Sequence, residues 1–460
     1  MLRKVGKIMM RPVLVGALLG AAAGVPAAAP PATEATSSGC LSGSCHAEIG
    51  ALKHRHGAVA EGGCLACHSG SDADHRSRGG KGFTLASKGS ELCRRCHSVP
   101  GKKKVVHAPV REGECTCCHA PHGAAGAHLL AQQGDLAPLC LGCHDKAPFT
   151  RKHLHGPVAE GRCDACHDPH ESDNKKLLSK QGRELCLSCH EDFARKMQKA
   201  RVVHPPLVKE LCTSCHDPHG SDQESLLRQA MPQLCVGCHK EIGDKIKKVK
   251  VPHQPVVQGK GCSSCHSSHF SDTEGLLNGA DQRRSCLKCH NSGKLGDPPL
   301  ADMEKELAGK SNLHGPIKKG RCTGCHDPHG SNYPRILAGN YPSEFYAPYR
   351  ADSYSLCLRC HDKNLLNFPE TTIYTRFRDG SRNLHYVHVN SSKGRSCRAC
   401  HESHASDGQK LVGVEGSRFG EWRVKTRLQL THTGGSCAPG CHRRYSYDRA
   451  SKKHDQAAPL

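Results

Sequence analysis

The chain has 460 residues and a formal net charge of +22, from 65 Lys and Arg residues against 43 Asp and Glu residues. Aromatic residues make up only 4% of it, with a single Trp, while Gly and Pro number 48 and 27. Such a chain cannot bury much apolar surface by itself, which excludes an ordinary globular protein built on one large hydrophobic core.

Residues 1–29 are predicted to be a signal peptide. A basic start that ends at Arg11 is followed by an apolar stretch from Val13 to Val25 and by Pro26-Ala27-Ala28-Ala29, an A-x-A-like cleavage site. The apolar run is short, Gly-rich and interrupted by proline, which disfavours the alternative of an uncleaved membrane anchor. We therefore expect an exported protein, in the periplasm or at the outer, extracellular surface.

Cysteine pairs followed directly by histidine occur fifteen times and use thirty of the thirty-one cysteines. Thirteen copies have a two-residue spacer, whereas the first has four residues and the last three. The paired cysteines are Cys40 and Cys45, Cys64 and Cys67, Cys93 and Cys96, Cys115 and Cys118, Cys140 and Cys143, Cys163 and Cys166, Cys186 and Cys189, Cys212 and Cys215, Cys235 and Cys238, Cys262 and Cys265, Cys286 and Cys289, Cys322 and Cys325, Cys357 and Cys360, Cys397 and Cys400, and Cys437 and Cys441. The histidines after them are His46, His68, His97, His119, His144, His167, His190, His216, His239, His266, His290, His326, His361, His401 and His442. Cys117 is interpreted as a spacer residue.

This spacing has a chemical reason. Two thiols one short turn apart can add to the two vinyl groups on one edge of a haem, and the following histidine then faces the iron as its proximal ligand. Zinc sites also use Cys-x-x-Cys pairs but do not require His directly after the second Cys. Disulfides would close only two-residue loops. We therefore expect about fifteen covalent haem c groups, and a largely unfolded chain without them.

The basic charge needs correction for these groups. Loss of the four basic leader residues leaves +18, and two propionates per haem bring fifteen ferric sites to about +3 and fifteen ferrous sites to about −12. The high isoelectric point therefore does not predict nucleic acid as a partner.

From His56 onward the motifs occur in pairs, and the first five copies repeat at a period near 50 residues. The clearest copy begins at His155-Gly-Pro, continues through Cys163-Asp-Ala-Cys166-His167-Asp-Pro-His170, and ends at Cys186-Leu-Ser-Cys189-His190. The predicted organisation is an N-terminal haem segment over 30–50, five regular two-haem modules over 51–310, and two expanded two-haem modules with aromatic-rich insertions over 311–460.

These motifs resemble the doubled CxxCH-motif family of multihaem c-type cytochromes and, more distantly, tetrahaem cytochromes whose irons are each held by two histidines. The resemblance covers nearly the whole mature chain and implies an exported electron carrier of anaerobic respiration. The chain departs from the regular pattern at its first and last motifs and after His68, where Ser69-Gly-Ser replaces a nearby histidine.

Twenty further histidines remain for fifteen distal iron positions. Thirteen of them recur either eight or nine residues before a first cysteine or three residues after a proximal histidine. The upstream set is His56, His107, His155, His204, His253, His314 and His388, and the downstream set is His122, His170, His219, His269, His329 and His404, with His75 replacing it in the first module. Only Met197, Met231 and Met303 lie outside the leader. We therefore expect iron held by two histidines throughout, at lower potential than His/Met haems.

The downstream histidines should ligate a neighbouring haem. Three residues span at most about 10 Å, too short a path around a porphyrin edge to the far face of the same iron. The repeats would then form a chain of closely spaced redox centres, the alternative being that these histidines are exposed loop residues. Of the others, His54 is a candidate for the N-terminal haem or its neighbour, and His432 or His385 for the last.

The expected fold is mostly irregular, with short α-helices organised around covalent haems in a linear repeat architecture and minor β-structure in the C-terminal third. All nine tyrosines and Trp422 lie beyond Asn332. Residues 372–389 predict a hairpin around Asp379-Gly380, and residues 421–430 a further strand. These insertions are expected to pack against haems, with a docking surface for a partner protein as the alternative.

Three classes of function fit the sequence. Electron transfer without catalysis is favoured, with no catalytic residue predicted. A reductase or oxidase of a small nitrogen or sulfur compound would need one open iron, often marked in known families by Lys in place of the motif histidine, and no motif here ends in Lys. The third class is a structural subunit of a cytochrome conduit or filament. Expected partners are redox protein donors and acceptors, with other multihaem cytochromes, an outer-membrane conduit and self-association left open.

Overall fold

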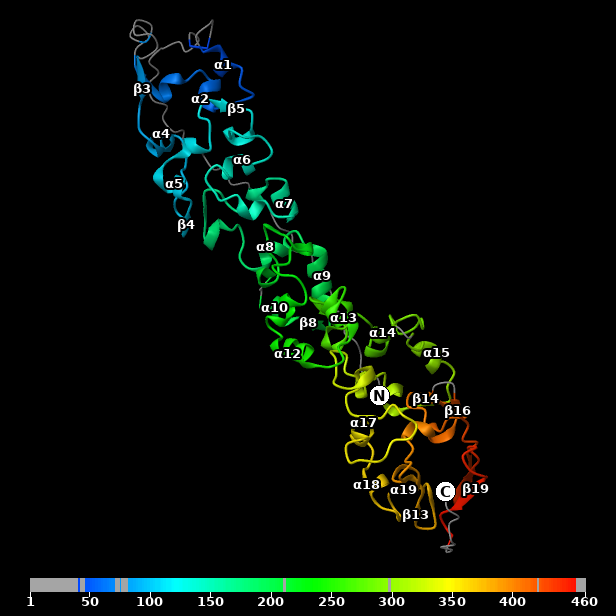
Figure 1. The fold of residues 1–460 in the computed structure, drawn as a ribbon. Coiled ribbons are helices and arrows are strands. Elements are labelled where there is room, and N and C mark those ends of the chain that lie inside the picture. Colours follow the sequence, from blue (N-terminus) through cyan, green and yellow to red (C-terminus); the bar gives the residue numbers. More distant parts are fainter. Residues whose placement is uncertain are drawn as a thin grey trace, which may run out of the picture. The chain divides into compact units, whose positions relative to one another are not determined.

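The computed structural model describes residues 40–41, 46–70, 75, 82–209, 212–296, 299–419 and 422–451, so the predicted signal peptide lies outside the described residues. The chain forms two compact units. The first comprises residues up to 99 together with 113–133, and the second comprises 100–112 together with 134–460. Within the second unit, Figure 1 shows the helices following one another in chain order from α6 (Ala137–Cys140) to α17 (Ser355–Leu358).

The first six modules use the same short elements in the same order. A one-turn helix follows the upstream histidine, a 3-10 turn holds the start of the first cysteine motif, and a second short helix carries the first cysteine of the next pair. The seventh module differs, because His388 lies inside a helix (Leu384–Val389) and Cys437 lies in a strand (Gly434–Cys437). The upstream helices are α2 (Gly57–Ala60), α5 (Ala108–Glu112), α7 (Gly156–Ala159), α10 (Pro205–Val208), α13 (Gln254–Val257) and α16 (Gly315–Lys318). The 3-10 turns are η2 (Cys64–Ala66), η3 (Cys115–Cys117), η6 (Cys163–Ala165), η8 (Cys212–Ser214), η10 (Gly261–Ser264), η12 (Cys322–Gly324) and η14 (Cys397–Ala399). The second-motif helices are α4 (Ser90–Arg94), α6, α8 (Arg183–Leu187), α11 (Gln233–Val236), α14 (Gln282–Leu287) and α17.

Few helices lie outside this pattern. The longest in the described chain are α9 (Glu191–Lys199) and α12 (Lys240–Lys248), each of nine residues and each beginning directly after a proximal histidine. The others are α1 (Ala47–Gly50), α15 (Met303–Leu307), α18 (Asn364–Asn367) and α19 (Leu384–Val389). Helices this short are not stable in isolation, so their conformation depends on what they pack against.

Two-residue antiparallel ladders link each module to the next. The strand before an upstream histidine pairs with the strand after the downstream histidine of the following module. These pairs are β1 (His54–Arg55) with β5 (Gly123–Ala124), β4 (Val105–Val106) with β7 (Glu171–Ser172), β6 (His153–Leu154) with β9 (Gly220–Ser221), β8 (Val202–Val203) with β10 (Phe270–Ser271), and β11 (Asn312–Leu313) with β14 (Ala405–Ser406). A single bridge from Val251 to Ser331 completes the series. The short helices and repeats agree with the sequence prediction, but β-structure is not confined to the C-terminal third.

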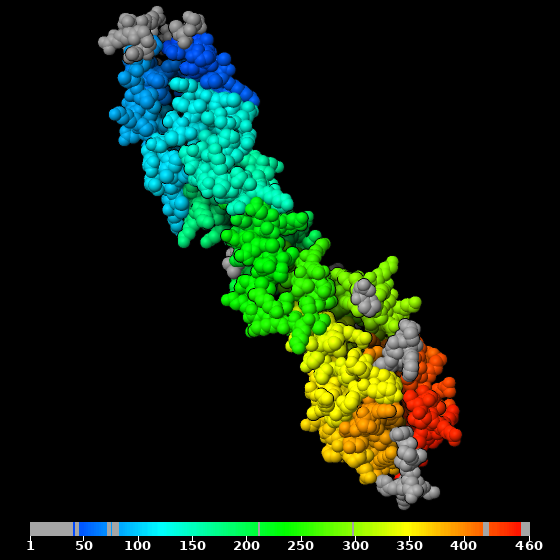
Figure 2. All heavy atoms as spheres, in the orientation of Figure 1, coloured from blue at the N-terminus to red at the C-terminus, as the bar shows by residue number. Residues whose placement is uncertain are grey.

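The remaining strands include β2 (His68–Gly70), paired with β3 (Phe83–Leu85). In the C-terminal part, β12 (Arg378–Asp379) and β13 (Arg382–Asn383) form the predicted hairpin at Asp379-Gly380. The strand prediction fails after Asn383, where the chain enters α19. The predicted strand over 421–430 is divided into β16 (Trp422–Val424), paired with β15 (Ser417–Phe419), and β17 (Gln429–Leu430), paired with β18 (Gly434–Cys437). β18 also pairs with β19 (Tyr445–Asp448), which Figure 2 shows in red beside the orange and yellow segments of the same unit.

A side-chain core is concentrated toward the C-terminus of the described chain. Of the eleven buried apolar residues that the structure describes, eight lie beyond residue 340. Tyr354, Leu366 and Val389 form a cluster against which Tyr341 and Tyr349 pack. The described parts of the regular modules therefore have few of the apolar side chains that ordinarily hold a fold together.

Asn383 fixes the start of α19. Its side chain is fully buried, donates to the carbonyls of Leu365 and Phe368, and accepts from the backbone amides of His385 and Tyr386. One side chain thus caps the helix and joins it to the preceding segment.

Replacing Asn383 by Ala should therefore destabilise this segment by about 2–4 kcal/mol, because it leaves buried polar groups without partners. Hydrogen exchange over residues 364–390 measures the loss of protection. Asn390→Ala, which removes one hydrogen bond, to the Leu366 carbonyl, is the matched control and should have a smaller effect. Equal exchange in the two variants would contradict this role of Asn383.

Candidate haem-binding sites

The 3-10 turn of each first motif places both cysteines and the following histidine on one short loop. In η6 the backbone N–H of His167 donates to the Cys163 carbonyl over 3.0 Å, and the equivalent bonds of His216 and His266 measure 3.1 and 3.0 Å. Among the described residues the motif cysteines are partly or fully exposed. Their thiols are therefore accessible to a group that attaches from outside the turn.

The second cysteine of a motif is held by the first through the backbone. Its N–H donates to the carbonyl of the first cysteine over 3.2–3.3 Å in both kinds of motif, as it does at Cys67, Cys96, Cys118, Cys143, Cys238, Cys289 and Cys360. Of these, Cys67 and Cys118 are half-buried in first motifs, whereas the second-motif residues Cys96, Cys143, Cys238, Cys289 and Cys360 are exposed. The two thiols therefore keep the one-turn spacing that attachment to a single haem edge requires.

The two variant motifs differ in what the structure describes of them. Cys441, after the three-residue spacer that follows Cys437, is exposed like the second cysteines of the regular second motifs. Cys45 lies outside the described residues, whereas its partner Cys40 is half-buried. The attachment of haem through Cys45 and through Cys441 therefore stays a prediction from the sequence.

In the described part of the chain, at least fourteen proximal histidines face a second histidine ring. For second motifs the partner is the upstream histidine of the same module: His97 with His56, His144 with His107, His190 with His155, His239 with His204, His290 with His253, His361 with His314 and His442 with His388. For first motifs the partner is the downstream histidine of the next module: His68 with His122, His167 with His219, His216 with His269, His266 with His329 and His326 with His404. His46 precedes the first module, and its partner is His75, which replaces the downstream histidine in that module.

The last module breaks this register. Here His401 faces His385, on α19 of the same module, with ring centroids 6.5 Å apart. The sequence suggested His385 only as one of two candidates for the last motif. In the preceding modules the upstream histidine faces the second motif of its own module. That regularity assigns His388 to His442 and leaves His385 for His401. His119 and His170 belong to different compact units, and ligation of a neighbouring haem by His170 stays a prediction from the sequence.

The ring separations test whether iron fits between the paired histidines. Most centroids lie 5.9–6.2 Å apart, for example 6.1 Å for His155 and His190. A metal–nitrogen distance of about 2.0–2.1 Å on each side, plus roughly 1.1 Å from each nitrogen to its ring centroid, gives about 6.3 Å. A direct nitrogen–nitrogen hydrogen bond of about 2.9 Å would place the centroids near 5.1 Å. The spacing of most pairs therefore fits two imidazoles on one metal ion, whereas the Nε2 atoms of His56 and His97 lie 3.4 Å apart, within direct hydrogen-bonding distance.

A backbone carbonyl orients the proximal histidine of most first motifs. The Nδ1 atom of His167 lies 2.8 Å from the carbonyl oxygen of Lys176, nine residues later. Equivalent contacts of 2.7–3.1 Å are made by His119, His216, His266, His326 and His401. A proton held on Nδ1 leaves Nε2 free to ligate metal, and such contacts also fix the ring plane.

The carbonyl is presented by a strained bend. Lys176 and Leu177 both adopt left-handed conformations, with φ of 59° and 57°. Pairs of left-handed residues also occur at 128–129, 225–226, 275–276, 335–336 and 410–411. Among these residues only Gly275 is a glycine. Non-glycine residues pay about 1–3 kcal/mol for such conformations. The strain recurs at the carbonyl to which the proximal histidine donates its Nδ1 hydrogen bond.

The upstream histidines are held from the following module. The Nδ1 atoms of His107, His204 and His253 lie 2.9, 2.9 and 3.0 Å from the carbonyls of Pro169, Ser268 and Pro328, each just before a downstream histidine. In addition, the backbone N–H of His155 donates to the His219 carbonyl over 3.1 Å. The upstream histidine of one module and the downstream histidine of the next are thus joined through the backbone.

The sequence around the downstream histidine also has a structural explanation. In the fourth module the Asp217 carboxylate accepts from the His219 amide, and the buried Ser221 hydroxyl donates to the Leu227 carbonyl and accepts from the Gln223 amide. Aspartate and serine therefore hold the loop by local side-chain-to-backbone bonds. They position the histidine and do not themselves face the ring pair.

Burial lowers the pKa of several of the paired histidines. The pKa of His385 is lowered to about 3. Burial is the larger cause, and the facing His401 ring is the second. Burial and the facing His326 lower the pKa of His404 to about 4. The pKa of His269 is lowered by the same two causes, with His216 as the facing ring. Neutral imidazole is the form that ligates metal.

Consecutive cysteine pairs adjoin one another. The thiols of Cys186 and Cys212, which belong to neighbouring modules, share a hydrogen bond. Cys93 with Cys115, Cys235 with Cys262, Cys286 with Cys322 and Cys357 with Cys397 do the same. Within the third module, burial raises the pKa of the Cys166 thiol, and the neighbouring Cys189 thiol raises it further. The attachment points therefore follow one another closely, within modules and between them.

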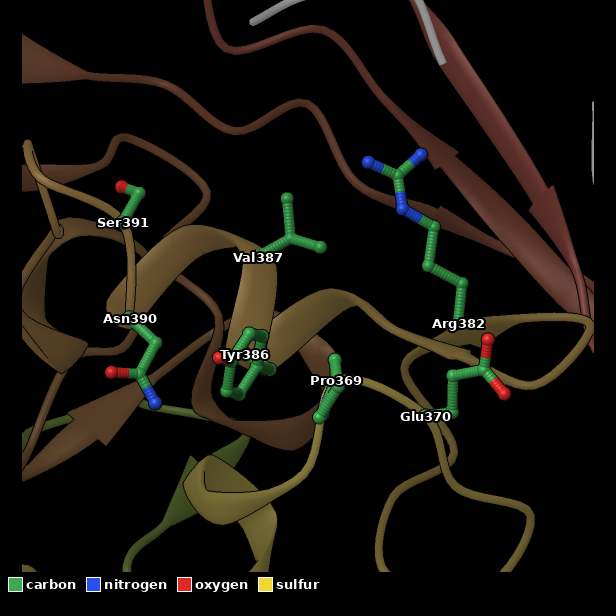
Figure 3. A pocket seen from close by; sticks show the side chains of 7 residues that line it. All are labelled: Pro369, Glu370, Arg382, Tyr386, Val387, Asn390 and Ser391. Carbon is green, nitrogen blue, oxygen red and sulfur yellow. The ribbon is translucent and has the colours of Figure 1, made fainter. Parts of the chain in front are cut away.

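The cavities of the second unit include two among its described residues. One of about 640 Å³ is lined by residues that include Cys189, His190 and His269, and so coincides with the attachment sites. The other, of about 380 Å³, is shown in Figure 3 and is lined by Pro369, Glu370, Arg382, Tyr386, Val387, Asn390 and Ser391. The second cavity contains no motif cysteine or histidine among these lining residues.

The structure describes two further candidates, His54 and His432, through their backbones. His54 lies in β1, which pairs with β5 of the next module. His432 accepts a hydrogen bond from Arg449 through its carbonyl. Cys117 lies in η3, with Sγ 3.5 Å from a Glu114 carboxylate oxygen, as expected of a spacer.

The strained bend can be tested at Lys176. Lys176→Gly should stabilise the protein by up to about 1 kcal/mol, because glycine adopts this conformation without strain. Lys176→Val should destabilise it by about 1–3 kcal/mol. Urea unfolding followed by haem absorbance measures both. Lys175→Val, at the preceding position, is the control, and identical midpoints for all variants would contradict the strain.

Comparison with known proteins agrees with this geometry. A family profile described as the doubled CXXCH motif matches residues 56–102, 107–149, 155–195, 204–244, 253–295 and 314–365. No curated protein matches the chain. The six matches cover more than half of the sequence and coincide with the first six modules. The chain therefore belongs to the doubled CXXCH-motif family of multihaem c-type cytochromes.

Proposed function

We propose that this chain is an exported electron carrier that passes electrons along haems held by two histidines each. The observation that carries this proposal is the series of facing histidine pairs, with ring spacings that fit one iron between two imidazoles. Haem c supplies an iron that takes up and releases one electron. The cysteines, proximal histidines and distal histidines keep each site in place without offering a position to a substrate.

The order of the cysteine pairs supports transfer between sites. Thiols of neighbouring modules share hydrogen bonds at five junctions among the described residues. Haems attached there would meet at their edges, so that electrons could pass along the repeats. Charge at one site would also raise the cost of reduction at the next, and the potentials would spread over a broad range.

The proposed setting follows from the leader over residues 1–29, which would direct the chain across one membrane to the periplasm or the outer surface, in anaerobic or extracellular respiration. No helix among the described residues is long and apolar enough to cross a bilayer. We propose redox proteins as partners, including other multihaem cytochromes, an outer-membrane conduit or further copies of the chain.

Carbon monoxide binding to the fully reduced protein tests the proposal, with haems counted by intact mass. We expect about fifteen haems and almost no bound gas, because both axial positions are occupied by histidine. A redox titration should be broad. Binding at one haem per chain would instead favour a reductase or oxidase, and binding at many would overturn ligation by two histidines. About thirteen haems would show that the variant motifs at Cys40 and Cys437 carry none.

Three ring pairs differ from the rest in the angle between their planes. The planes of His56 and His97 are 50° apart, those of His388 and His442 43°, and those of His46 and His75 31°. The other pairs lie within 11–26°, for example 11° for His155 and His190.

Ferric low-spin haem with tilted imidazole planes has a larger maximal g value than haem with parallel planes, because axial geometry sets the iron's electronic structure. We therefore expect two classes of signal in electron paramagnetic resonance of the oxidised protein, the minor one from about three haems. His388→Ala should remove one haem from this minor class, whereas His155→Ala should leave it intact. One uniform class of signal would contradict the assignment.

A further inference from the structure

Phe193 occupies a junction between two haem sites. It lies in the first turn of α9, three residues after the proximal His190. Its ring packs edge-on against His269, with centroids 5.0 Å apart and planes at 87°, and also against Phe270 at 5.1 Å and 65°. Edge-to-face contact is a favoured geometry for aromatic rings.

The two sites at this junction belong to different modules. Cys189 and His190 form the second site of the third module, whereas His269 faces His216, in the first site of the fourth module, at 5.9 Å. The cavity of about 640 Å³ is lined by Cys189, His190 and Phe193 on one side and by His269 and Phe270 on the other. Phe193 therefore stands beside one site while it contacts the distal histidine of the next.

We propose that Phe193 is a positioning residue that holds the His269 imidazole at the iron of the site of Cys212 and Cys215. The inference rests on the proposed function, in which His216 and His269 both ligate that iron. Because His216 is already fixed through its Nδ1 contact with the Ser225 carbonyl, the distal ring is the ligand that needs support. Edge-on packing restricts rotation of the His269 ring and excludes water and small ligands from that side.

A second junction has the same arrangement. Phe149, five residues after the proximal His144, packs against His219 with centroids 5.2 Å apart and planes at 52°. His219 in turn faces His167 at 6.1 Å. The equivalent of Phe193 in α12 is Ile242, the third residue after His239. An aromatic ring therefore supports the distal histidine at two junctions, and the corresponding helix position at the next is aliphatic.

The experiment compares carbon monoxide binding and electron paramagnetic resonance of the holoprotein with those of Phe193→Ala. The wild type should bind almost no gas, and Phe193→Ala should bind it at one haem per chain, with one low-spin signal changed. Phe193→Tyr should restore the wild-type behaviour because it keeps the ring. Phe149→Ala should open one haem independently, and the double variant two.

Met197→Ala is the matched control, because Met197 is a half-buried apolar residue on the same helix one turn later. Gas binding by this variant equal to that of Phe193→Ala would show general loosening of α9 and overturn the inference. Unchanged gas binding and spectra in Phe193→Ala would also overturn it while leaving the proposed function intact. Gas binding at many haems in the wild type would overturn the proposed function itself.

Discussion

The facing pair of histidines is the interaction on which the rest of this structure depends. In a first motif, one ring follows its own cysteine pair and the other comes from the next module, as with His216 and His269. Such a module cannot complete its own first site. The two-residue ladders and the backbone bond from His155 to His219 hold the contributing loops in place. Because few apolar side chains are buried in the described parts of the regular modules, ligation by the paired histidines would take over the role that a hydrophobic core has elsewhere.

Local chemistry is arranged around those rings. A left-handed bend presents the Lys176 carbonyl to His167, and Asp217 and Ser221 tie down the loop that carries His219. Each of these features costs backbone freedom or strain. The strain is tolerated because the surrounding hydrogen bonds leave the loop few alternatives.

Much of this could be predicted from the sequence. The proximal histidines were identified from the covalent geometry of the motif, and the short reach of three residues predicted that a downstream histidine such as His219 faces another module, as it does at His167. The sequence did not identify which neighbour, because that depends on ladders of two residues, too short to leave a periodic pattern. The helix α19 was also missed. Alternation over 372–389 predicted strands, whereas the buried Asn383 caps a helix there.

The position of His385 has a wider consequence for how such a chain can begin and end. An array in which every repeat borrows a ligand from the next has no natural last member, and cutting it at any module boundary would expose one iron. The C-terminal segment solves this problem by supplying His385 from within the last module, on a helix held by the side-chain cluster around Tyr354. The site of His401 therefore needs no ring from a further module. Modules could be inserted ahead of this segment without changing that pair, whereas loss of His385 would leave His401 without a facing ring.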